Sequence, residues 1–491
     1  MRSRALGFVL LALLLAAGGA RAVEVRLRGE RLSLRSKQEP LTAFLKQLAH
    51  AGVRVRVDPQ AEARVTADFE NEDLQKALAA VLEPFGYVLI WDVIEGPLGP
   101  VQKLAEVQVY MPGREKSLQP LAGVDPNLAV ATGAAPGGPE FVADEILISF
   151  KPGTSQEDVW LLLGQIGGTL VEGIPELGIY QVRLAPGSNI PALVEQLAGK
   201  PIVAHVEPNY VLRPPEPSSA PADAIPEPGR LEKPAKDAVS VAVLDSGLRA
   251  QPALTNAIVG AYDALDPGRA IADPVGHGTQ MAMIAAGAVV PAAAGGEADS
   301  LPVVAVRAFD DRGVTSNFGL MRGLAYALGQ GARVVNMSWG TETKSDFLET
   351  AVRYAQSKNT LMVAAAGNEP TGRAVYPAAL SGVVAVSALG ADGRAWDSSN
   401  YGDFVTVSAP GTAVFPVGYR GAPGSYAGTS IASAYTARTL ALYFTQHPAA
   451  TPKDALKALK AAVTDAGPAG RDARYGYGVL DAAAVQRLLS Q

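Results

Sequence analysis

The feature that most constrains the fold is an alternation of short, wholly apolar runs with helical segments in the second half of the chain. Apolar residues at helical spacing occupy 279–288, 318–329 and 346–357. The apolar runs lie around and between them, at 239–244, 302–306, 334–337, 361–365 and 383–387. Buried strands that alternate with helices are typical of a parallel sheet covered on both faces. We therefore predict an α/β, doubly wound parallel sheet within residues 237–491.

Three reactive side chains occur in suggestive contexts in this region. Asp245 ends an apolar run, and ligands in such sheets bind at the carboxyl ends of the strands. His277 lies in Gly-His-Gly-Thr, and Ser430 lies in Gly-Thr-Ser-Ile-Ala-Ser. Each has an ordinary alternative role, as a turn former, a packed imidazole or a small buried helix residue. Together they supply the acid, imidazole and hydroxyl of a nucleophilic triad.

The order Asp, His, Ser along the chain is that of subtilisin. Five further motifs follow this pattern: Val334-Val335-Asn336-Met337-Ser338-Trp339-Gly340, Met362-Val363-Ala364-Ala365-Ala366-Gly367-Asn368, Tyr376-Pro377-Ala378, Ser408-Ala409-Pro410-Gly411 and Tyr475-Gly476-Tyr477-Gly478. Residues 237–491 therefore resemble the subtilisin-like serine proteases (subtilases).

The resemblance implies a role for four residues in catalysis. Ser430 would be the nucleophile, and His277 the general base that later acts as general acid. Asp245 would orient the imidazole. The side-chain amide of Asn368 and the backbone N–H of Ser430 would form the oxyanion hole.

The resemblance also implies a peptide-binding cleft with polypeptide substrates. The substrate backbone would add as a strand along residues 338–340, which form one wall of the cleft. The primary pocket would lie between this wall and a second wall formed by residues 365–367. Val375 would contribute to the floor of the pocket, and Trp339 would restrict the neighbouring pocket. No acidic residue lies in these walls, so we expect apolar or aromatic side chains before the cut bond. The predicted substrate-binding residues are Ser338, Trp339, Gly340, Ala365, Ala366 and Gly367.

The chain departs from the family at two places beside this chemistry. Gln280 stands where the family often has His, and Ala434 stands where it commonly has Pro. No cofactor is required for the chemistry, and we assign no metal ligand. Structural calcium would need oxygen ligands such as Asp263, Asp266 and Asp273, for which the ordinary alternative is a solvated acidic loop.

Two small α+β domains are predicted before the catalytic domain. Residues 23–117 show helical spacing at 40–48 and 74–82, and strand-like runs at 53–57, 65–69 and 87–94. This pattern resembles the short N-terminal domain of secretins and TonB-dependent outer-membrane receptors. An unrelated small α/β domain is the alternative.

Residues 118–142 are rich in Gly, Ala and Pro and are predicted to be a linker. Residues 143–212 follow as a split βαβ pattern with a capping box at Ser155 and Asp158. They resemble the propeptide of subtilases, which implies an intramolecular inhibitor that assists folding; a passive spacer is the alternative. The Pro-rich residues 213–236 are expected to form an exposed, extended tether.

The N-terminus has the features of a secretory signal peptide at residues 1–22. Arg2 and Arg4 precede an apolar stretch, and Ala20-Arg21-Ala22 fits a small-residue cleavage site. An uncleaved anchor is the alternative. The chain has 0 Cys, so an exported form would rely on packing rather than disulfides. A hydrophobic content of 48% and a net charge of −6 give no indication of nucleic-acid binding.

These features predict an exported serine endopeptidase, secreted or periplasmic in a Gram-negative-type envelope, made as a zymogen and self-processed. No membrane span would remain after signal cleavage. Two alternatives stay open. One is a pseudoprotease that only binds peptides. The other is a processing protease tethered to an envelope protein through residues 23–117.

Overall fold

The computed structural model describes residues 23–96, 98–123, 127–133, 138–220, 222, 224–294 and 299–491. The predicted signal peptide at 1–22 lies outside the described residues. The chain divides into two compact units. Unit 1 comprises the chain up to Asp92 together with Gln102–Val124, and unit 2 comprises Val93–Val101 and Asp125–Gln491.

Unit 1 contains the helices and strands that the sequence predicts for residues 23–117. Helix α1 (Leu41–His50) and helix α2 (Leu74–Leu82) bury their leucines in one core. Two sheets contribute to this core. The first has the strand order β1 (Val23–Arg28), β2 (Arg31–Pro40), β4 (Arg64–Asp73), and the second has the order β5 (Gly86–Ile94), β6 (Val101–Tyr110), β3 (Arg54–Val57), β7 (Gln119–Pro120).

The first part of unit 2 is an antiparallel sheet with two helices, α3 (Gln156–Ile166) and α4 (Ile190–Ala198). The Ser155 side chain accepts from the Asp158 N–H, as the capping motif predicts. The sheet order is β10 (Thr169–Ile174), β11 (Ile179–Arg183), β9 (Glu140–Phe150), β12 (Val203–Leu212), β17 (Thr315–Ser316), with β8 (Val130–Thr132) on β9. Because β17 comes from the following domain, one sheet joins the two domains.

A seven-stranded sheet forms the centre of the following domain, and all its pairings are parallel. Its order is β15 (Ile258–Asp263), β16 (Val303–Arg307), β14 (Val241–Asp245), β18 (Val334–Met337), β19 (Leu361–Ala365), β20 (Val384–Leu389), β21 (Val407–Pro410). Strand β14 near the middle has both faces buried. Such a sheet places the carboxyl ends of β14 and its neighbours at one edge.

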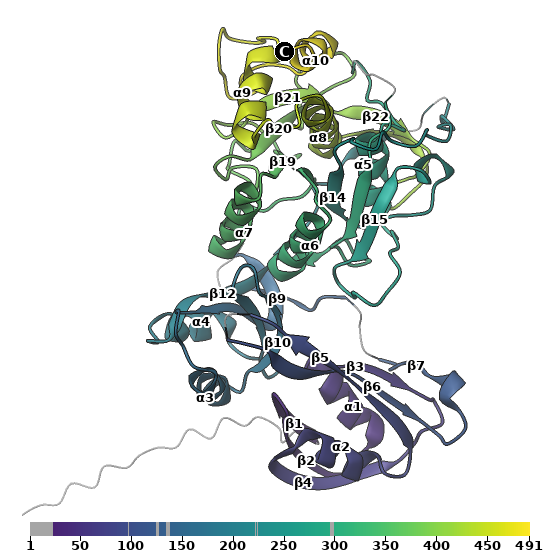
Figure 1. Cartoon of the computed structure of the whole chain (residues 1–491), viewed down its shortest axis with the longest axis vertical. Helices are drawn as coiled ribbons and strands as arrows, with labels where there is room; N and C mark the ends of the chain where they lie inside the picture. The colour runs from purple at the N-terminus through teal and green to yellow at the C-terminus, as the bar shows by residue number, and fades with distance from the viewer. Residues whose placement is uncertain are drawn as a thin grey trace, which may run out of the picture. The chain divides into compact units, whose positions relative to one another are not determined.

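Helices cover both faces of this sheet, as Figure 1 shows. Val241 and Val243 of β14 point into a core with α5 (His277–Ala286) and α8 (Thr429–Gln446). Ala242 and Leu244 point into a second core with α6 (Asn317–Gly329) and α7 (Asp346–Ser357). The doubly wound prediction is confirmed. Two C-terminal helices, α9 (Pro452–Ala462) and α10 (Ala482–Leu489), complete the first core.

The two predicted connecting segments contain ordered strands. Within 118–142, β7 pairs with β3 and β8 pairs with β9. Within 213–236, β13 (Ser218–Ala220) pairs with β23 (Gly424–Ala427), which also pairs with β22 (Thr412–Phe415). Residues 218–220 are exposed and extended, as expected for this segment, and they are in addition paired with a neighbouring strand. Prolines hold this backbone extended, and an extended backbone can add to an available strand edge.

Among the described residues, the helices are all too short or too polar to cross a bilayer.

Candidate active site

Asp245 and His277 meet at the end of strand β14. Asp245 is the last residue of the buried strand, and His277 is the first residue of α5. Their side chains are about 1% exposed, and His277 Nδ1 lies 2.7 Å from Asp245 Oδ1. Because an ionised carboxylate only accepts hydrogen bonds, this contact assigns the proton to Nδ1. His277 Nε2 then presents a lone pair and can act as a base.

Gly276 allows His277 to reach this position. Its φ is +91°, and a Cβ there would lie 2.2 Å from the carbonyl oxygen of Gly418. Only glycine fits such a backbone at such a contact. On the other side, the ring of Tyr419 lies edge-on to the His277 imidazole, with 5.6 Å between the two ring centres. Burial raises the pKa of Tyr419, so this neighbour stays neutral.

Ser430 lies in the first turn of α8, next to the carboxyl ends of the strands. It is 3% exposed. Its Oγ, His277 Nε2 and Asp245 Oδ2 are buried and make no hydrogen bond within the described chain. Buried polar atoms are nearly always paired. These three atoms are among the few buried polar atoms of the described residues without a partner, and Ser430 Oγ and His277 Nε2 form no hydrogen bond with each other.

A buried polar network holds the backbone of Ser430. The Ser433 hydroxyl donates to Asn336 Oδ1 at 2.7 Å, and Asn336 Nδ2 donates to Ser338 Oγ at 2.8 Å. Ser338 Oγ donates in turn to the Ser430 carbonyl at 3.3 Å. The network ties β18 to the start of α8. Sequence reasoning assigned Ser338 only to substrate binding and gave no role to the Asn336 and Ser433 side chains.

Asn368 follows strand β19 and is fixed by the residue before Ser430. Its Oδ1 accepts from Thr429 N at 2.9 Å and from Thr429 Oγ1 at 2.8 Å. Since two donors fix the amide oxygen, Nδ2 must face the other way. There it donates to the main-chain carbonyl of Glu216 at 2.8 Å. Asn368 therefore holds a peptide carbonyl beside the start of α8.

The predicted pocket walls carry little side-chain bulk. A Cβ at Gly340 would lie 2.4 Å from Val375 Cγ1, and one at Gly367 would lie 3.6 Å from Val375 Cγ2. The Val375 side chain thus lies between the two glycines. Ala365 and Ala366 are buried. Asn400, which sequence reasoning missed, braces this wall by donating to the Ala366 carbonyl at 3.1 Å.

The expectation for the Trp339 side chain was wrong. The indole is 1% exposed within the second core, and its Nε1 donates to the Leu244 carbonyl at 3.0 Å. Its ring therefore packs behind the sheet edge and does not restrict a neighbouring pocket. The alternation of side chains along an extended segment sends Trp339 inward, away from the side where a substrate would lie.

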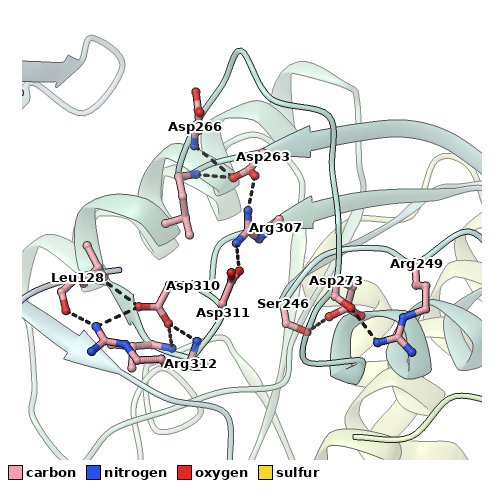
Figure 2. A network of polar contacts seen from close by, with 12 residues as sticks. Leu128, Ser246, Arg249, Asp263, Asp266, Asp273, Arg307, Asp310, Asp311 and Arg312 are labelled. Atoms are coloured by element: carbon pink, nitrogen blue, oxygen red, sulfur yellow. Dashed lines mark hydrogen bonds and ion pairs between the residues drawn. The ribbon is translucent and has the colours of Figure 1, made fainter. Parts of the chain in front are cut away.

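The three aspartates considered as calcium ligands have other partners. Asp263 Oδ2 accepts from the Arg307 guanidinium at 2.6 Å, and Asp263 Oδ1 accepts from the N–H of Asp266 at 3.2 Å. Asp273 lies apart from them, beside Ser246 and Arg249 (Figure 2). The described residues contain no cluster of three or more metal-ligating His, Cys, Asp or Glu side chains.

Asp273 links the two segments that carry Asp245 and His277. Its Oδ1 accepts from Ser246 Oγ at 2.8 Å and from Gly276 N at 2.7 Å. Its Oδ2 accepts from Thr279 N at 2.8 Å and from Thr279 Oγ1 at 2.6 Å. One buried carboxylate thus joins the turn after β14 to the first turn of α5. In the sequence, the only indication of this linking role is that Asp273 lies four residues before His277.

Comparison with known proteins identifies the family of the chain. The model of the subtilase family matches residues 236–478, and that of the fervidolysin N-terminal prodomain matches residues 128–209. The thermophilic serine proteinase of Bacillus sp. (strain AK1) is 30% identical over 317 residues, which cover 62% of this chain and 79% of that protein. The chain belongs to the subtilase family.

Two further similarities cover smaller shares of the other protein. The minor extracellular protease Epr of Bacillus subtilis (strain 168) is 35% identical over 49% of this chain but only 37% of its own length. The crystal structure of fervidolysin from Fervidobacterium pennivorans superimposes with a TM-score of 0.59 at 21% identity, over 75% of this chain and 64% of that chain. The latter shows a shared fold. The expected class, a subtilisin-like serine peptidase with a prodomain, is confirmed at the level of the family.

The prodomain of this subtilase contacts the catalytic domain through the end of β12. The Glu207 carboxylate accepts from the Ser345 hydroxyl and from Asp346 N at 3.2 Å, at the start of α7. Asn209 Oδ1 accepts from Phe318 N at 3.1 Å, in the first turn of α6. Both contacts satisfy N–H groups that a helix N-terminus leaves free. Burial raises the pKa of Glu207, against the opposing hydrogen bond from Ser345.

Proposed function

We propose that this subtilase is an exported serine endopeptidase that cleaves peptide bonds with Asp245, His277 and Ser430. One observation carries the proposal. Asn368 donates to a peptide carbonyl, at 2.8 Å, while its amide oxygen is fixed by the residue preceding Ser430. A site that holds a peptide carbonyl beside a buried, unpaired hydroxyl is built for acyl transfer.

The reaction follows from the polarity of these groups. His277 Nε2 takes the proton from Ser430 Oγ as this oxygen attacks the carbonyl carbon. The negative charge on the carbonyl oxygen is stabilised by Asn368 Nδ2 and by the N–H of Ser430 in the first turn of α8. The C–N bond then breaks, and His277 transfers its proton to the leaving nitrogen. Water hydrolyses the acyl-enzyme in the reverse sequence of proton transfers.

Asp245 keeps the imidazole in the required tautomer throughout. Its hydrogen bond to Nδ1 at 2.7 Å favours the positive charge that His277 carries in the transition state. Substrate backbone would add along Ser338, Trp339 and Gly340, with the side chain before the cut bond entering the space lined by Val375. The small residues there support our expectation of apolar or aromatic side chains.

The zymogen state is supported by the prodomain and by its contacts with α6 and α7. We propose that the signal peptide directs the chain to the periplasm or the exterior and that the prodomain inhibits the enzyme until it is cleaved. We further propose that residues 23–117 bind an envelope protein, as in the short domains that they resemble. A pull-down with the full-length Ser430→Ala chain and with the same chain lacking 23–117 tests this partner.

The catalytic assignment is tested by labelling with a serine-directed fluorophosphonate. The signal-less chain, activated by limited digestion, is expected to gain one probe mass on Ser430. The Ser430→Ala variant should stay unlabelled, whereas Ser357→Ala, at the exposed end of α7, serves as the matched control and should still label. Absence of labelling in activated wild type, together with no hydrolysis of an added peptide, would favour the pseudoprotease alternative.

A further inference from the structure

Residues 213–220, here called the cleft segment, run along the proposed active site. The Gly340 N–H donates to the Arg213 carbonyl at 3.4 Å on one side. Asn368 Nδ2 donates to the Glu216 carbonyl at 2.8 Å in the middle. On the other side, Ser218–Ala220 form strand β13, antiparallel to β23. The segment is therefore bound on both sides of the carbonyl that occupies the oxyanion position.

The peptide bond after that carbonyl is Glu216–Pro217. We propose that Pro217 makes the cleft segment a built-in inhibitor that the enzyme's own active site cannot cut at this bond. The proposal rests on the proposed function and adds to it how the resting precursor survives its own triad. It concerns one bond and one residue, so it can be tested directly.

The chemistry of proline supplies the first reason. Cleavage requires His277 to protonate the leaving nitrogen as the C–N bond breaks. In Glu216–Pro217 this nitrogen is part of a ring and carries Cδ in place of hydrogen. The ring carbon crowds the side of the nitrogen that must approach the imidazole. The nitrogen also cannot rotate independently of the ring, so proton transfer is impeded.

The pairing of β13 supplies the second reason. Ser218, Ser219 and Ala220 are in register with Ala427, Tyr426 and Ser425 of β23. If the bond did break, these pairings would hold the new amino terminus beside the acyl-enzyme. A nucleophile held in place has a very high effective concentration, so re-ligation would compete with water and slow net hydrolysis, in addition to the barrier that Pro217 sets against breaking the bond.

The position of the Glu216 side chain supplies the third reason why this bond resists cleavage. Its carboxylate is 79% exposed and lies 3.9 Å from the Arg420 guanidinium, rather than between Gly340 and Gly367. Pro214 and Pro215 have no N–H, so this part of the chain cannot donate to the pocket wall as a substrate strand would. The cleft segment therefore fills the oxyanion position with fewer of the contacts that align a substrate, keeping the hydrogen bond from the Gly340 N–H to the Arg213 carbonyl.

The test follows the mass of the signal-less full-length chain over time. Wild type is expected to show no cut at Glu216–Pro217. Pro217→Ala should produce one fragment that ends at Glu216 and another that begins at residue 217. The rate of cleavage at this bond should exceed that of wild type by about tenfold or more. Pro226→Ala, in the exposed stretch that follows, is the matched control and should behave as wild type. The double variant Pro217→Ala/Ser430→Ala should remain whole at this bond.

A second measurement removes any dependence on the folding of the variant. A synthetic peptide of residues 211–220 is added to the wild-type chain after activation, and the same peptide with Ala at 217 is compared with it. The native peptide should inhibit and stay intact, and the altered peptide should be cut after Glu216.

The outcomes separate this proposal from the proposed function. Cleavage of wild type at Glu216–Pro217 would overturn it, as would an altered peptide that resists an enzyme able to hydrolyse other peptides. If activated wild type neither labels with fluorophosphonate nor hydrolyses any peptide, the catalytic function fails and this inference fails with it.

Discussion

Replacing Asp273 by Asn isolates the contribution of one buried carboxylate to the placement of the proposed triad. Asp273 is 4% exposed and accepts from Ser246 Oγ, Gly276 N, Thr279 N and Thr279 Oγ1, at 2.6–2.8 Å. An amide offers one oxygen and one NH₂ in place of two oxygens. Two of the four donors would therefore face another donor.

The cost can be worked out contact by contact. A hydroxyl facing the amide NH₂ can rotate and accept, but a backbone N–H cannot. At least one buried N–H loses its partner, which costs about 1–3 kcal/mol. The two contacts that remain lose their charge assistance, about 1 kcal/mol each. A loss of about 3–5 kcal/mol approaches the whole stability of a small domain, but a catalytic domain with two large cores is expected to stay folded.

The Asp273→Asn substitution should lower the activity by displacing Asp245 and His277 relative to each other. Asp273 bonds Ser246, next to Asp245, and Gly276, next to His277, so its loss lets the acid and the imidazole drift apart. A misplacement of about 1 Å costs on the order of 10²-fold in rate. We expect kcat on a chromogenic peptide to fall about 10–100-fold with KM within about twofold.

The assay compares the activated chain with Asp273→Asn and with the matched control Asp392→Asn. Asp392 lies in an exposed turn, where its side chain accepts from Arg394 N at 3.1 Å. Thermal unfolding is followed in parallel. The reasoning is refuted if Asp273→Asn lowers the melting temperature but leaves kcat unchanged, because the carboxylate would then stabilise the fold without positioning the triad.

Three further predictions address the oxyanion donor, the prodomain and the core. Asn368→Ala should lower kcat about 10²–10³-fold with little change in KM; an unchanged kcat in steady-state assays would remove it from the oxyanion hole. Since burial raises the pKa of Glu207 in the bound prodomain, the strength of prodomain binding should be lost as pH rises through that raised value. Inhibition by the prodomain should thus weaken with rising pH, and Glu207→Gln should flatten the profile of inhibition against pH; an equally steep profile would assign the effect elsewhere. Trp339→Phe should cost about 1–2 kcal/mol of stability in denaturant unfolding and leave substrate preference unchanged, whereas a shifted preference would return the indole to the pocket.

The sequence by itself determined five of the seven strands of the central sheet and the three helices α5, α6 and α7 that pack on it. Apolar runs such as 241–245 are buried on both faces, so their composition alone specifies central strands of a parallel sheet. The residues next to Asp245, His277 and Ser430 specify the local backbone conformation at each of these positions. Gly276, for example, is required by a positive φ and a close carbonyl, and this requirement is visible as a glycine next to the histidine.

Only the tertiary structure decided which side each residue faces and which distant groups meet. Trp339 was expected to restrict a pocket, but its ring points into the core because successive side chains of an extended backbone alternate. Asp273 was considered only as a possible calcium ligand or a solvated loop aspartate, since its four donors come from residues that only folding assembles. The cleft segment was expected to be exposed and extended, and its pairing could not be predicted for the same reason. Its partners at Gly340, Asn368 and β23 are far away in sequence, and hydrogen bonds between such segments leave no periodic pattern in the chain.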